Sequence, residues 1–194
     1  MKRWCAICLL SVVGNVLLAQ KHIDTLQYIS LEEAKTMSAA NVYAIDLSKN
    51  RLKEVPEDIK EFHNLKGLKL SKNKLTHLPD FLKDMKSIQF LYLNKNKFKI
   101  FPHQVFHLFE LRVLDVSKNK IQSLPMGVKS LEELEYLDLW ATRITTLPQA
   151  LTSLKKLSYL DVRGVTFSKT FVEKWTNELP NTTVKFERPC RCLE

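Results

Sequence analysis

The stretch that decides the fold is "LRVLDVSKNKIQSLPMGVKSLEE", residues 111–133. Its apolar residues, one Asn and one Pro follow the order L-x-x-L-x-L-x-x-N-x-L-x-x-L-P-x-x-L-x-x-L-x-x. The same order recurs every 23 residues, in units that begin at Val42, Leu65, Ile88, Leu111, Leu134 and Leu157. A fixed period of this length predicts a solenoid of stacked units, because no unit can bury both of its sides alone.

The first half of each unit predicts a short strand. Leu114 and Val116 are two residues apart and therefore point to one face, whereas Val113, Asp115 and Ser117 point to the other. We expect the first face to lie in the core and the second to lie in solvent. The Pro that follows stops the strand. Apolar residues spaced by three then favour a loose or 3₁₀-like helix on the return.

The Asn at the ninth position is predicted to be buried and to bond backbone groups that the turn leaves unpaired. This ladder consists of Asn50, Asn73, Asn96 and Asn119. The fifth unit departs from it in "LDLWATRITTLP", residues 137–148, where Thr142 replaces the Asn and Trp140 replaces a small Ser. Thr has one hydroxyl donor where Asn has two amide donors, so the architecture gives no reason to prefer it. The departure favours a binding anchor at Trp140, with local packing over the missing Asn as the alternative.

These units resemble the leucine-rich repeat family, in its 23-residue type with an L-P pair. Five units match closely, and the sixth is degenerate because Val165 replaces the Asn; together they cover residues 42–167. The resemblance implies an α/β solenoid: a leucine-rich repeat arc with short parallel strands on its concave face, irregular or 3₁₀ segments on its convex face, and helical caps. The chain is similar to exported bacterial members, since it lacks cysteine-rich caps. The resemblance implies a module that binds another protein.

Both ends of the repeats carry a predicted helix. Ser30 and Glu33 have the spacing of a capping box, so we expect a helix to start there in an N-terminal cap, residues 20–41. "FVEKWTNELP", residues 171–180, predicts an amphipathic helix, and "TTVKF", residues 182–186, predicts a last strand. We assign both to a C-terminal cap and tail, residues 168–194.

Residues 1–19 are predicted to be a cleaved signal peptide. Two cations precede an apolar run from Trp4 to Ala19 that ends at a site suited to cleavage, which leaves Gln20 as the first residue. A transmembrane anchor is the alternative, but the run is shorter than the roughly 20 residues that a spanning helix needs. We expect an exported protein, periplasmic, at the cell surface or secreted, with no membrane span after cleavage. If the segment is not a signal, the alternative is a cytoplasmic protein.

Residues that perform catalysis or bind metals do not converge in the sequence. Only four glycines are present, which argues against a Gly-rich nucleotide-binding loop. The repeats contain His63, His77, His103 and His107, and no third ligand is spaced to complete a zinc site. Cys190 and Cys192 are too close for an unstrained bridge and are interpreted as part of a frayed tail. We expect no cofactor, no metal and no enzymatic activity; turnover by the pure protein would support the opposite.

Side chains that point to the concave face form columns down the stack. Neighbouring strands are about 5 Å apart, so the aromatic side chains of the later units are predicted to form one continuous patch. Exposed aromatic side chains rimmed by charge mark binding surfaces. The column of Asp residues at the fifth position is interpreted instead as a solvated face. The predicted partner-binding residues are Phe90, Tyr92, Val113, Tyr136, Trp140, Tyr159 and Arg163.

A basic ridge follows the strands, at the eighth and tenth positions of the units. The chain has a net charge of +9, which falls to +7 without Lys2 and Arg3 of the signal. We favour solubility as the role of the ridge; the alternative is an adhesin-like or envelope protein that binds anionic glycan or lipid. Nucleic acid is not expected, because no aromatic side chains are interleaved for stacking on bases. The candidate anion-binding residues are Lys49, Lys72, Lys74, Lys95, Lys97, Lys118, Lys120 and Arg143.

Overall fold

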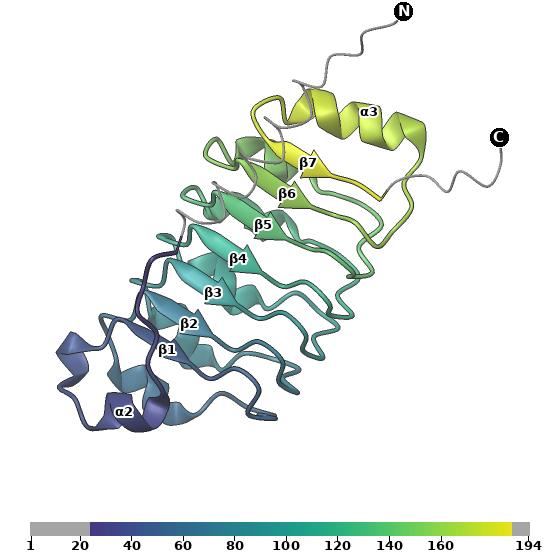
Figure 1. The fold of residues 1–194 in the computed structure, drawn as a ribbon. Helices are drawn as coiled ribbons and strands as arrows, with labels where there is room; N and C mark the ends of the chain where they lie inside the picture. Colours follow the sequence, from purple (N-terminus) through teal and green to yellow (C-terminus); the bar gives the residue numbers. More distant parts are fainter. Residues whose placement is uncertain (1–23, 188–194) are drawn as a thin grey trace, which may run out of the picture.

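The computed structural model describes residues 24–187, which form one row of stacked repeats (Figure 1). Its strands pair in parallel and in sequence order. Partners in the first six strands are 23 residues apart, from Ala44 and Gly67 to Tyr136 and Tyr159, which confirms the predicted repeat. The strands are β1 (Ala44–Asp46), β2 (Gly67–Lys69), β3 (Phe90–Tyr92), β4 (Val113–Asp115), β5 (Tyr136–Asp138), β6 (Tyr159–Asp161) and β7 (Thr183–Lys185).

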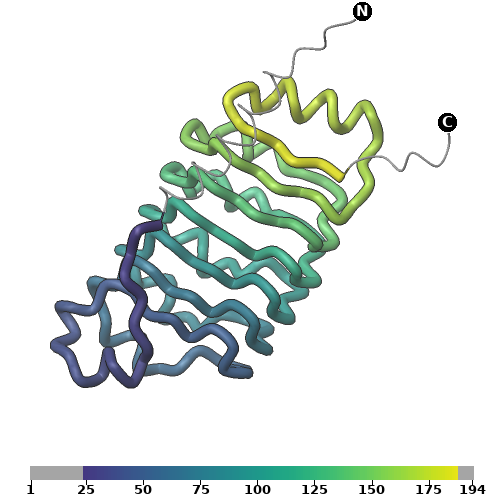
Figure 2. Tube along the Cα trace, viewed as in Figure 1, coloured from purple at the N-terminus to yellow at the C-terminus, as the bar shows by residue number. Residues whose placement is uncertain are grey.

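The return segments are short 3₁₀ helices, and each follows the Pro of its unit. They lie behind the sheet, so that the chain makes one flattened turn per repeat (Figure 2). Pro suits this position because its fixed φ and its missing N–H stop the strand. The first turn of the following helix does not need that N–H. The predicted convex face is therefore confirmed. It contains η2 (Glu57–Glu61), η3 (Asp80–Asp84), η4 (His103–His107), η5 (Met126–Ser130) and η6 (Gln149–Ser153).

The Asn ladder is present and joins each unit to the one before it. The Asn96 amide donates to the carbonyl of Leu70 in the preceding unit at 2.9 Å and to that of Leu93 in its own unit at 2.9 Å. Its oxygen accepts from the N–H of Leu75 at 3.0 Å. Asn73 and Asn119 repeat this pattern.

Asn50 does not belong to the ladder, so the prediction was wrong at this position. Its side chain is exposed. The reason is geometric, because the ladder bonds run backwards to the preceding unit and the first unit has no repeat before it.

Helices occur at both ends of the repeats, where the sequence predicts them. At the N-terminal end, α2 (Leu31–Lys35) begins after Ser30, whose hydroxyl accepts from the Glu33 N–H at 3.1 Å, and η1 (Ala39–Asn41) follows. At the other end, α3 (Lys169–Glu178) places Trp175 in the core. The last predicted strand is confirmed as β7, which pairs with β6.

The predicted signal peptide and the Cys190 and Cys192 pair lie outside the described residues. Within residues 24–187, no helix has both the length and the apolar character needed to cross a membrane.

Candidate functional site

The segment that precedes α2 covers the concave side of the first strands. In Figure 1 this segment, drawn in purple, runs across the front of the sheet. Leu26 and Tyr28 lie on Gly67 of β2, where an added Cβ atom would be 2.5 Å from Tyr28 Oη and 2.8 Å from Leu26 Cδ1. Asp24 Oδ2 accepts from the hydroxyls of Tyr28 and Tyr92, both at 2.7 Å. We call residues 24–28 the N-terminal strap.

The strap explains why the first half of the predicted patch is not an open surface. Phe90 and Val113 are only 5% and 3% exposed, so their assignment to an exposed patch was wrong. Phe90 pairs with Gly67, over which the strap lies, and Val113 pairs with Phe90 and Tyr136, whose larger side chains flank it. Tyr92 is half-buried, and burial together with its bond to Asp24 raises the pKa of its hydroxyl. Its hydroxyl is therefore engaged within the chain.

Among the described residues, Tyr136 and Asp138 of β5 and Tyr159 of β6 are partly exposed on the concave face. The rings of Tyr136 and Tyr159 stack in parallel, with centroids 4.6 Å apart. Trp140 follows β5 and is 37% exposed. Cations of the preceding and the following unit lie near its ring, with Lys118 Nζ 4.1 Å and Arg163 Cζ 5.7 Å from the ring centre. We call Tyr136, Asp138, Trp140, Tyr159 and Arg163 the concave site.

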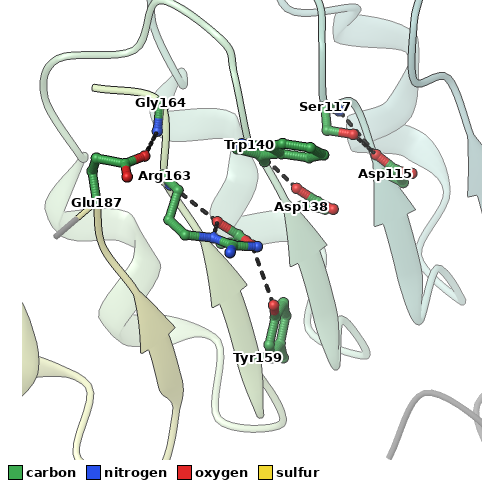
Figure 3. A network of polar contacts seen from close by, with 9 residues as sticks. Asp115, Ser117, Asp138, Trp140, Tyr159, Arg163, Gly164 and Glu187 are labelled. Atoms are coloured by element: carbon green, nitrogen blue, oxygen red, sulfur yellow. Dashed lines mark hydrogen bonds and ion pairs between the residues drawn. The ribbon is translucent and has the colours of Figure 1, made fainter. Parts of the chain in front are cut away.

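The concave site is not one continuous aromatic surface, as the sequence predicted. Figure 3 shows the Arg163 guanidinium between Trp140 and Tyr159, with Asp138 beside Trp140. Arg163 Nη2 lies 2.5 Å from the buried Asp161 carboxylate, which also accepts from the Tyr159 hydroxyl at 3.2 Å. Burial and Asp161 raise the pKa of Tyr159 to about 12. A polar row therefore separates two aromatic contacts.

The Asp column terminates the strands and is more than a solvated face. Asp115, Asp138 and Asp161 are neighbours across three strands. Each Oδ1 accepts from the backbone N–H two residues further on, at 2.9, 2.8 and 3.0 Å. Such local bonds replace the interstrand hydrogen bonds that are lost where the strand ends. The interpretation of these residues as solvated is corrected by their burial, which is complete for Asp161 and partial for the other two.

Asp138 is the carboxylate at the centre of the site. Burial and the neighbouring Asp115 raise the pKa of Asp138 to about 7. Among the described residues its only hydrogen bond is the one from the Trp140 N–H, whereas Arg163 is committed to Asp161. The concave site therefore has a carboxyl group that ionises near neutral pH and has no bonded cation within the described chain.

The fifth unit loses part of the ladder. Thr142 is buried, and its hydroxyl donates to the Leu139 carbonyl at 2.8 Å, which corresponds to the bond that each ladder Asn makes within its own unit. Within residues 24–187 it makes neither of the bonds that the other units make to the preceding repeat. Trp140, the other residue of this unit that departs from the repeat, lies on the concave side with its ring partly in solvent. Thr142 and Trp140 therefore have different surroundings.

The basic ridge follows the strands along one edge of the solenoid. Seven of its eight candidate residues are exposed, and the eighth, Lys118, is half-buried against Trp140. No ridge cation forms an ion pair with a described carboxylate. Lys49, Lys72, Lys95 and Lys118 have φ values between 54° and 65°, a left-handed conformation that Gly and Asn adopt more readily. The eighth position of these four units therefore holds a lysine although the left-handed backbone costs about 1 kcal/mol at each.

A metal site has no support in the described part of the chain. No group of three His, Cys, Asp or Glu side chains is placed to hold an ion there. The repeat histidines are all exposed and are spread over the turns and return segments: His63, His77, His103 and His107.

Two family models match the chain: "Leucine rich repeat" over residues 40–98 and "Leucine-rich repeat region" over residues 99–179. Together with the fold, they show that the chain is a leucine-rich repeat protein. A solved structure of the leucine-rich repeat protein LIC12759 from Leptospira interrogans aligns at 22% identity with a TM-score of 0.36. The alignment covers 74% of this chain and 54% of that one, so this chain spans about half of that protein's length. No curated protein matches.

Sequence reasoning missed three residues that shape the site. Lys118 was assigned to the ridge only, although its unit stands directly before the one that contains Trp140. Asp138 could have been found, because it is the central Asp of three neighbouring units and only the last has an Arg two residues later. Asp24 gives no signal of this kind, since it lies outside the repeats.

Proposed function

We propose that the protein is a non-catalytic module that binds another protein through the concave site. Membership of the leucine-rich repeat proteins supports a protein partner, since this family generally mediates protein–protein interaction. The observation that carries the proposal is Trp140, a large apolar side chain that remains 37% exposed on the part of the concave face that the strap leaves open. Tryptophan and arginine are the residues that most often dominate binding at interfaces.

The surroundings of Trp140 suit an anchor. Lys118 and Arg163 hold the ring before a partner arrives, so less side-chain entropy is lost on binding. The stacked Tyr136 and Tyr159 rings offer a second apolar contact on the other side of the polar row. Asp138 offers an acceptor to a partner N–H or ammonium group. A partner surface with an apolar pocket next to a donor therefore fits this arrangement.

Trp140→Ala tests the proposal. The variant is expected to weaken partner binding by about 2 kcal/mol or more, which is about thirtyfold in Kd, while its melting temperature changes little because the ring is partly in solvent. A partner is obtained by pull-down from the native compartment, and its affinity is measured by titration calorimetry. Met126→Ala is the matched control, since Met126 is an exposed apolar residue of η5 on the opposite face. A Trp140→Ala variant that melts much earlier and still binds would identify Trp140 as a packing residue.

Salt distinguishes the concave site from the basic ridge. Contacts made by aromatic rings are expected to persist when the salt concentration is raised, whereas contacts made by the ridge are screened. Loss of the partner at high salt would therefore contradict binding by the concave site. Turnover of a substrate by the pure protein would contradict the non-catalytic assignment.

Export is part of the proposal and rests on residues 1–19 alone. We expect the exported protein to begin near Gln20, which N-terminal sequencing measures. Full-length protein that starts at Met1 in the cytoplasm would overturn it.

A further inference from the structure

An isoleucine of the third unit is exposed among cations. Ile100 is 80% exposed, the largest value among the large apolar side chains of residues 24–187. It occupies the thirteenth position of its unit, where the other units have Glu54, His77, Ser123, Thr146 and Lys169. Packing gives no reason for an apolar residue there, because a side chain so exposed gains almost nothing from burial.

Ile100 lies in a groove along the same edge as the basic ridge. It lines a cleft of about 430 Å³ with Lys97, Lys99, His77 and His103. A second cleft of about 350 Å³ continues over the earlier units and shares Thr76, His77 and Lys97 with the first. We call the two together the Ile100 groove. Its charged lining consists of one carboxylate, Glu54, and four lysines, which are Lys53, Lys74, Lys97 and Lys99.

The lysines and the exposed Ile100 side chain together determine the chemistry of the ligand that fits the groove. None of these four lysines forms an ion pair with a described carboxylate, so the groove presents four lysines against one carboxylate around the exposed Ile100 side chain. A hydrophilic polyanion would engage the lysines and leave Ile100 in water. A surface with anionic groups above an apolar layer satisfies both.

We propose that the Ile100 groove docks the protein on a bilayer that contains anionic lipids. Lys97 and Lys99 contact lipid phosphates, and Ile100 enters the boundary between headgroups and acyl chains. This surface is separate from the concave site, because it is built from the turns after the strands and not from the open strand face. The concave site therefore stays accessible while the groove is occupied.

Vesicle sedimentation tests the inference with the full chain. Vesicles of equal parts phosphatidylglycerol and phosphatidylcholine are compared with vesicles of phosphatidylcholine alone. On the anionic vesicles, Ile100→Ser is expected to lower the partition coefficient about fivefold, as for partial burial of one isoleucine. Lys97→Gln with Lys99→Gln is expected to lower it about twenty-fivefold, since each lysine near such a surface contributes about fivefold.

Matched controls separate the groove from net charge and from other apolar residues. Lys129→Gln with Lys155→Gln removes the same charge from exposed lysines of the convex side, and Met126→Ser removes an exposed apolar side chain there. The apolar segment of residues 4–19 is present in every variant, so only differences between variants count. The inference is supported if the groove variants lose binding and the controls retain it.

Three outcomes would overturn the inference. The first is equal losses in the control variants, and the second is equal binding of the wild-type chain and the groove variants to the anionic vesicles. The third is binding to a soluble polyanion such as dextran sulfate that Ile100→Ser leaves unchanged while vesicles are not bound, which would show that the ridge recognises a hydrophilic polyanion.

Discussion

Replacing Asp138 by Asn is expected to stabilise the protein above neutral pH and to change little in acid. The half-buried carboxyl group lies between Asp115 and Asp161, and the nearest guanidinium, that of Arg163, is committed to Asp161. Ionisation therefore places a negative charge beside other carboxylates. An Asn amide has the same shape, and its oxygen can still accept from the Trp140 N–H, which lies 2.8 Å from Asp138 Oδ1.

The sign and size of the effect follow from the pKa of Asp138. Burial and Asp115 raise this pKa from 3.8 to about 7, so the folded state holds the proton more tightly than the unfolded chain. The resulting stability is fully present below about pH 4 and is lost as the pH rises through 7. Each pKa unit corresponds to about 1.4 kcal/mol, which sets an upper limit of about 4 kcal/mol. The partial contact of Asp138 with solvent reduces the expected gain to about 1 to 2 kcal/mol.

Urea unfolding at about pH 4 and about pH 8.5 measures the difference. Asp46→Asn is the control, because Asp46 makes the same bond to the N–H two residues on, at 2.7 Å, but is exposed at the first strand. Only Asp138→Asn is expected to gain stability at the higher pH. An equal effect of Asp138→Asn at both pH values, or a loss at about pH 8.5, would refute the reasoning.

Three further predictions concern the turns of the repeats. Asn96→Ala is expected to lower the unfolding free energy by about 1 to 3 kcal/mol, because three backbone groups lose their partner; equal melting temperatures for this variant and Lys95→Ala would contradict the ladder. Thr142→Asn is expected to raise the unfolding free energy by about 1 kcal/mol in urea titration, since the amide can restore bonds to the preceding unit. Gly164→Ala is expected to cost about 1 to 2 kcal/mol, because φ is +100° and the new Cβ would be 2.7 Å from Ala141 Cα; an unchanged urea midpoint would show that the turn relaxes.

The repeat register was predictable because it depends on local rules that recur. Leu114 and Val116 point inwards by the alternation of any strand, and both are fully buried. The Pro of each unit marks the start of its 3₁₀ helix for an equally local reason. A single mistake in one unit would also have been corrected by its neighbours, since the same pattern is observed several times.

The extent of the open concave face was not predictable, because it depends on a contact that occurs only once. Asp24 and Tyr92 are 68 residues apart, and no periodic pattern connects them. The small size of Gly67 was a local hint, since a residue without a side chain in an otherwise filled column leaves room for another segment. Without knowledge of the strap, Phe90 looked like part of an exposed patch.

The fifth unit departs from the repeat at three consecutive residues, and their surroundings show whether the departures share one cause. Trp140 lies in the concave site, Ala141 replaces the left-handed lysine with φ 53°, and Thr142 is buried at the ladder. If the indole covered the gap left by the missing Asn, restoring the amide would have less effect in its presence. We expect instead that Thr142→Asn stabilises the Trp140→Ala variant by the same amount as the wild-type chain, because the ring is partly exposed beside Lys118 and Arg163 whereas Thr142 is buried. Urea unfolding of the four proteins in this double-mutant cycle measures the coupling. A coupling free energy above about 0.5 kcal/mol would show that Trp140 repairs the gap and would remove the reason to treat it as a binding anchor.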